Sequence, residues 1–94
     1  MKLNLNKPLL TLDGKPASDA GGNNVTLGKE LAIRLAQLSK GDAIKLFDWS
    51  RKLYGGDPLE LDRSDYKTLK DTVENLDGIT ILFKAQLLEC FNEK

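Results

Sequence analysis

The stretch from Thr26 to Tyr54 constrains the fold of this 94-residue chain most, because two amphipathic patterns follow each other there with one short break. Apolar residues recur at the three- and four-residue spacing of a helical face, and most charged residues fall elsewhere. The first helix is predicted to run from an N-cap at Thr26 to about Ser39, and the second from Ala43 to Tyr54 after an N-cap at Asp42. The short link between them favours a helical hairpin with the two apolar stripes packed together.

The second helix of this hairpin has an unusually aromatic stripe. Its members are Ala43, Leu46, Phe47, Ser50, Leu53 and Tyr54, with Ile44 and Trp49 beside them. Because Phe47, Trp49 and Tyr54 carry large apolar rings, we expect all three to be buried.

Two further helices are predicted in the C-terminal half. One spans about Asp65 to Leu76 behind an N-cap at Asp62 or Ser64, and the other spans about Ile79 to Phe91. The last helix is apolar on nearly every side, because its strongly polar positions are only Lys84, Gln86 and Glu89. Such a helix is expected to be buried on more than one side. Either it is the central helix of the domain, or part of it forms an interface with another chain.

The first quarter of the chain has the alternating pattern of short β-strands. Residues 2–6 and 10–12 alternate polar and apolar side chains, and Asp13-Gly14 is a strong turn signal for a hairpin. The first strand could pair with the second or with another partner, and Leu59-Glu60-Leu61 could add a short strand to it. Residues 18–24 contain two adjacent glycines and no periodicity, which is typical of a flexible surface loop.

These elements together predict a mainly α (α+β) fold with about four helices and a small N-terminal β element. The length allows one domain over residues 1–94, in which residues 1–25 form strands and a loop and residues 26–94 form the helical core.

Composition excludes several functions more clearly than it indicates one. Fourteen basic and fourteen acidic residues give no net charge and no global attraction to nucleic acid or to an anionic membrane. Histidine is absent, which removes the commonest general base and transition-metal ligand. The single cysteine, Cys90, lies in the most apolar helix and is expected to be a core residue. No phosphate-binding or dinucleotide-binding glycine motif is present, so we predict no enzymatic activity, catalytic residue or cofactor.

An acidic segment around Leu61 raises the question of a metal site. Its carboxylates are Asp57, Glu60, Asp62 and Asp65. The spacing does not match a calcium-binding loop, because Tyr66 and Val73 occupy ligand positions. Helix capping explains Asp62 and Asp65 better, so we predict no metal site. The chain has neither a secretory signal pattern nor a long apolar run, and a cytoplasmic location is the expectation.

Several segments resemble small proteins encoded in bacteriophage and prophage genomes. They are Thr26-Leu27-Gly28 with Leu31-Ala32, Lys40-Gly41-Asp42-Ala43 with Lys45 and Trp49, Leu53-Tyr54, Leu61-Asp62 with Asp65 and Leu69, and Lys84-Ala85-Gln86-Leu87-Leu88. The resemblance implies an accessory protein in the cytoplasm of a bacterial host, which works by contacting other proteins. It supplies no functional residues.

The sequence thus favours a non-enzymatic protein-interaction module, a phage or prophage accessory or assembly protein that self-associates or binds a phage or host protein. The predicted interface residues are Phe83, Leu87 and Phe91 in the last helix, with Trp49 as a second anchor. The alternative is a small DNA-binding regulator that contacts phosphates through Lys45, Arg51 and Lys52 of the second helix.

Overall fold

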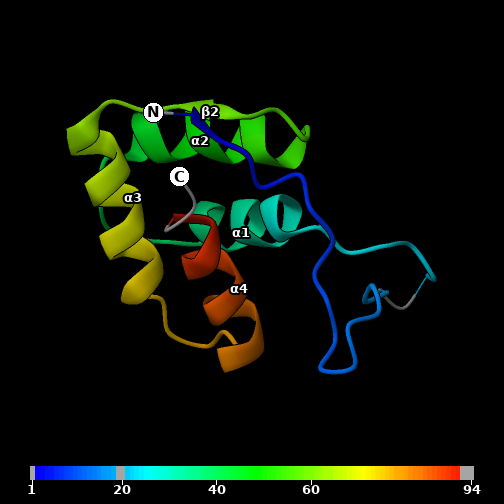
Figure 1. Cartoon of the computed structure of the whole chain (residues 1–94). Helices are drawn as coiled ribbons and strands as arrows, with labels where there is room; N and C mark the ends of the chain where they lie inside the picture. Colours follow the sequence, from blue (N-terminus) through cyan, green and yellow to red (C-terminus); the bar gives the residue numbers. More distant parts are fainter. Residues whose placement is uncertain (1, 19–20, 92–94) are drawn as a thin grey trace.

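The computed structural model describes residues 2–18 and 21–91. Within these ranges the chain is mainly α-helical with a small β element, which confirms the predicted fold class (Figure 1). The elements in chain order are β1 (Lys2–Leu3), α1 (Leu27–Ala36), α2 (Ala43–Tyr54), β2 (Leu59–Glu60), α3 (Arg63–Glu74) and α4 (Ile81–Phe91).

The helices begin behind a short polar side chain, and for α4 the Thr80 hydroxyl accepts the Phe83 N–H at 3.1 Å. The side-chain oxygens of Thr26, Asp42 and Asp62 each accept a hydrogen bond from the backbone N–H three residues later, at 3.2, 3.1 and 2.7 Å. These bonds satisfy first-turn N–H groups that have no partner within the helix. The predicted caps at Thr26 and Asp42 are confirmed. Because Asp62 and not Ser64 caps α3, that helix begins at Arg63, earlier than predicted.

The end of α1 differs from the prediction. The helix stops at Ala36 and not near Ser39. The backbone N–H groups of Gln37 and Leu38 donate to carbonyl oxygens only three residues back, both at 3.2 Å, which tightens and ends the last turn. The bounds of α2 are those predicted.

The helical body, residues 27–91, is built on the predicted hairpin. Helices α1 and α2 run side by side, α3 packs on α4, and α4 also contacts α1 (Figure 1). The core between them is mostly leucine and contains Leu27, Leu31, Leu35, Leu53, Leu69, Val73 and Leu87. Leu5, just after β1, is also fully buried in it.

Helix α4 is internal along one side. Phe83, Leu87, Cys90 and Phe91 are buried against the rest of the core, as expected for Cys90. The helix begins at Ile81 and not at Ile79. Ile81 is exposed at its first turn, so the coverage of this apolar helix is incomplete.

Of the pairings that the sequence leaves open for the first strand, the structure has the one with the segment Leu59-Glu60. Strand β1 runs antiparallel to β2, with Lys2 opposite Glu60 and Leu3 opposite Leu59. The predicted turn at Asp13-Gly14 is present, and a backbone bridge pairs Leu10 with Pro16 across it. The second alternating segment therefore forms its own small hairpin.

Residues 8–18 and 21–26, here called the N-terminal arm, lead away from the helical body (Figure 1). Three backbone hydrogen bonds join its segments in a ring: Leu9 N–H donates to the Val25 carbonyl, Val25 N–H to that of Ala17, and Ala17 N–H to that of Leu9, at 2.8, 3.0 and 2.8 Å. Of the predicted flexible loop, residues 19–20 lie outside the described residues, whereas Ser18 and Asn24 form a backbone bridge.

One side chain of α4 attaches this arm to the helical body. The Gln86 side-chain oxygen accepts the Leu10 N–H at 2.9 Å, and its amide nitrogen donates to the Leu10 carbonyl at 2.8 Å. The glutamine amide thereby bonds Leu10 as a neighbouring strand would.

Candidate interaction surface

The four interface residues predicted from the sequence lie in the core. Trp49, Phe83, Leu87 and Phe91 each expose 6% or less of their surface. The Phe91 ring meets the ring of Tyr66 edge-on at 5.3 Å, and the Tyr66 hydroxyl donates to the Phe91 carbonyl. Burial raises the pKa of Tyr66 above its ordinary value, and the neighbouring Cys90 adds to the shift. These four residues are thus covered mainly by their own chain and do not form an exposed apolar surface.

The three cations proposed for DNA contact lie on α2, close to carboxylates. Lys45 Nζ is 2.7 Å from Asp65 Oδ1, and Lys52 Nζ and Arg51 Nη2 are 3.0 and 3.5 Å from the carboxylate of Asp48. The ion pair with Asp65 raises the pKa of Lys45. The hydrogen bond from Lys52, followed by the contact with Arg51, lowers the pKa of Asp48. These carboxylates weaken the positive potential that a phosphate backbone would need.

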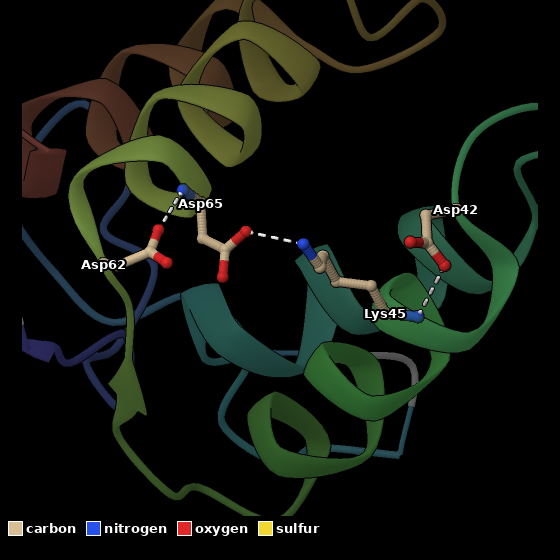
Figure 2. A network of polar contacts seen from close by, with 4 residues as sticks. All are labelled: Asp42, Lys45, Asp62 and Asp65. Atoms are coloured by element: carbon tan, nitrogen blue, oxygen red, sulfur yellow. Dashed lines mark hydrogen bonds and ion pairs between the residues drawn. The ribbon is translucent and has the colours of Figure 1, made fainter.

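The Lys45–Asp65 pair belongs to a polar network between two helix N-termini (Figure 2). Asp42 caps α2 at the N–H of Lys45, and Asp62 caps α3 at the N–H of Asp65. The two capped residues then bond each other through their side chains. The network therefore ties α2 to α3 and uses two carboxylates of the acidic segment for structure. In the described ranges no three metal-ligating side chains gather into a possible ion site.

The α1–α2 hairpin carries a different apolar surface, because Phe47 and Tyr54, which were predicted to be buried, are exposed. Phe47 and Tyr54 of α2 are 61% and 56% exposed, and Ile33 of α1 is 41% exposed beside them. The reason is the orientation of α2, which turns Trp49 and Leu53 toward the core and leaves the neighbouring aromatic stripe outside.

These side chains line a groove of about 330 Å³ along the seam between the two helices, here called the seam groove. Its lining residues are Ala32, Ile33, Ala36, Phe47, Ser50, Arg51 and Tyr54. Ala32 and Ser50 are small and buried at the seam. Small residues at a helix crossing let the backbones come close, which leaves Ile33 and the aromatic rings standing higher on each side. The Ser50 hydroxyl donates to the Leu46 carbonyl at 2.7 Å, so it adds little polarity to the groove.

Two cations lie over the aromatic rings of the groove. The Arg51 guanidinium is 5.2 Å from the ring centre of Phe47, and Lys29 Nζ is 5.7 Å from that of Tyr54. Both distances allow a cation–π interaction. The groove therefore combines an apolar lining with positive charge, and none of its seven lining residues is acidic.

The sequence of α2 contains a pattern that indicates an exposed apolar face, although we predicted Phe47 and Tyr54 to be buried. Ala43, Phe47, Ser50 and Tyr54 repeat at helical spacing, but Leu46, Trp49 and Leu53 form a second stripe on the same helix. One helix cannot turn both stripes fully inward when a single layer of neighbours covers it. Two overlapping apolar stripes on one helix therefore indicate that one of the stripes stays exposed to solvent.

Comparisons with known proteins add no family to this picture. No family model matches the chain, and no curated protein and no solved structure matches it. Among the helices of residues 2–18 and 21–91, none is long and apolar enough to cross a membrane.

Proposed function

We propose that this chain is a non-enzymatic protein-interaction module and that the seam groove binds its partner. The observation that carries the proposal is the exposure of Phe47 and Tyr54 next to Ile33, on two helices that share one groove. Single exposed apolar side chains are ordinary, whereas adjoining ones around a concave surface mark interaction sites. Aromatic residues are also the commonest anchors of protein interfaces.

The groove offers a partner a substantial hydrophobic contribution. Fully burying a large apolar side chain contributes about 1.5–3 kcal/mol, and Phe47, Tyr54 and Ile33 still expose a large part of theirs. Because the flanking helices are packed on the core, the groove is already formed and little further ordering of the backbone is needed on binding.

The proposal departs from the sequence-based hypothesis in the surface used, and keeps its function class. A phage or prophage origin rests on the resemblance alone, and the proposal does not depend on it. DNA binding receives no separate support, because Lys45, Arg51 and Lys52 all lie next to carboxylates.

A display library of random peptides panned on the purified protein tests the proposal. The Phe47→Ala/Tyr54→Ala double variant, which lacks both rings of the groove, is left out of the panning and serves as the comparison protein for the enriched peptides. We expect enriched peptides to bind the wild-type protein at least about tenfold more tightly than the double variant, a difference of about 1.4 kcal/mol.

The matched control is Ile44→Ala, which removes an 83% exposed apolar side chain from the same helix but outside the groove. Peptide affinity for this variant should equal that for the wild type, and circular dichroism melts should show that all three proteins stay folded. If no peptide is enriched, or if enriched peptides bind the double variant equally well, the groove is not the binding surface.

A further inference from the structure

We propose that the occupant of the seam groove is an amphipathic α-helix with acidic flanks, supplied by a partner protein; this rests on the proposed function and specifies its partner. Both sides of the groove are helices, whose backbone N–H and C=O groups are bonded within α1 and α2. An extended peptide finds no strand edge there to pair with. A helix needs none, because it binds through side chains that interdigitate with those of the groove.

The length of the groove fits two turns of a helix. Phe47 and Tyr54 are seven residues apart on α2, which corresponds to about 10 Å along the helix axis. A docked helix presents apolar side chains over the same distance at positions i, i+4 and i+7. Such a helix would complete a three-helix bundle with α1 and α2 and place its apolar face on Ala32 and Ser50.

The charges around the groove indicate which residues should lie beside the apolar positions of the docked helix. Arg51 lines one side, and Lys29 lies at the Tyr54 end. Asp48 is the carboxylate near Arg51, but it lies closer to Lys52, and one carboxylate cannot neutralise two cations. The groove therefore has two cations at its rings and no acidic residue in its lining, although the whole chain has no net charge. Glutamate or aspartate beside the apolar positions of the docked helix would complement this charge.

The same charges argue against a second copy of this chain as the occupant. Pairing one groove with another around a two-fold axis would bring Arg51 and Lys29 of both copies into a single interface. Like charges placed together in an interface oppose association.

Two designed helical peptides of about 16 residues test the charge and the helical form together. Both carry leucines at positions i, i+4, i+7 and i+11, and the flanking positions are glutamate in one peptide and lysine in the other. Fluorescence anisotropy of the labelled peptides measures their affinities at low and high salt. We expect the glutamate peptide to bind at least about tenfold more tightly, with a smaller difference at high salt. Its circular dichroism should show more helix on binding.

Charge reversal at one position links the preference to the groove. Arg51→Glu should abolish or invert the preference for the glutamate peptide. Lys52→Glu is the matched control, because Lys52 is the next residue and also bonds Asp48 but does not line the groove. This variant should keep most of the preference.

The outcomes separate this inference from the proposed function. Equal binding of both peptides, or no effect of Arg51→Glu, would overturn the acidic partner. Groove-dependent library peptides that bind without gaining helix would overturn the helical partner, and in both cases the interaction module stands. If light scattering shows a dimer that Phe47→Ala/Tyr54→Ala dissociates, the occupant is a second copy. A library that yields no groove-dependent peptide contradicts the proposed function itself.

Discussion

The helical body and the N-terminal arm are held in place by different kinds of contact. In the helical body, side chains such as Leu31, Val73 and Leu87 are completely buried. In the arm, Leu9 packs partly buried against the core, but Leu12 is 93% exposed, and the other contacts are the backbone ring of Leu9, Ala17 and Val25 and the bonds to Gln86. An exposed hydrogen bond contributes less to stability than a buried leucine, since water replaces it on opening. The arm should therefore open locally at a lower free energy than the helical body unfolds.

The largest effect should come from the leucine core. Leu31→Ala removes a fully buried side chain of α1 and should lower the free energy of unfolding by about 2–5 kcal/mol, as measured in urea. Leu12→Ala makes the same chemical change on the exposed arm and should alter stability by less than about 0.5 kcal/mol. Equal losses would show that the arm is packed and that the contrast is mistaken.

The next largest loss of stability is expected at Gly28, and Gly14 serves as its comparison. A Cβ added to Gly28 would lie 3.1 Å from the Leu53 carbonyl oxygen and 3.2 Å from that of Leu5, and neither backbone can move cheaply. Gly28→Ala should therefore cost about 1–3 kcal/mol in thermal or urea unfolding.

Gly14→Ala meets no neighbouring atom but places alanine at a φ of +84°, which costs about 1 kcal/mol. This strain should destabilise the arm locally, so backbone amides near the turn should exchange their hydrogens faster. If Gly14→Ala destabilises the helical body more than Gly28→Ala does, the close approach at Gly28 is less restrictive than the distances indicate.

A smaller effect is expected at the attachment of the arm. Gln86→Leu removes both bonds to Leu10 and should cost about 0.5–1.5 kcal/mol, with faster hydrogen exchange at the Leu10 amide. Amides in α2 should exchange as before. Glu89→Gln, an exposed change on the same helix, is the control. Unchanged protection of Leu10 in the Gln86 variant would mean that the ring alone holds the arm.

The smallest effect concerns the polar link between α2 and α3. The pKa of Lys45 is raised by Asp65, so the pair stabilises the fold fully below the ordinary lysine pKa of about 10.5. This contribution is lost as pH rises through the raised pKa. The stability advantage of the wild type over Lys45→Met should shrink in that window, as followed by urea unfolding at several pH values. An advantage that persists at higher pH would indicate lost packing and not lost charge.

The local features of this fold could be predicted from the sequence. Thr26, Asp42 and the turn at Asp13-Gly14 act through neighbouring backbone groups, so their roles depend little on the rest of the chain. The four helices could be predicted because their apolar residues recur at helical spacing. The partner of β1 was one of several alternatives that the sequence left open, and the role of Gly28 could not be predicted, because both depend on segments far away in the sequence.

The candidate site shows the same limit. The sequence marks Phe47 and Tyr54 as apolar, but the rotation of α2 that exposes them is set by packing against α1 and the core. Conversely, Phe83 and Phe91 were predicted to face a partner because α4 is apolar on nearly every side, whereas their own chain covers them. A periodic pattern identifies an apolar face without identifying what covers it.

The pairing of β1 with β2 has a consequence for how the chain reaches this fold. Leu3 meets Leu59, and Leu10 meets Gln86, so these residues are synthesised well before the partners that they contact in the fold. The α1–α2 hairpin, by contrast, needs only neighbouring residues and can form early, because local contacts close small loops. We expect pulse-labelling hydrogen exchange during refolding to protect α1 and α2 before the Leu10 amide. Until then, Leu3 and Leu5 remain open to contacts with other chains, which exposes this segment to misfolding during synthesis.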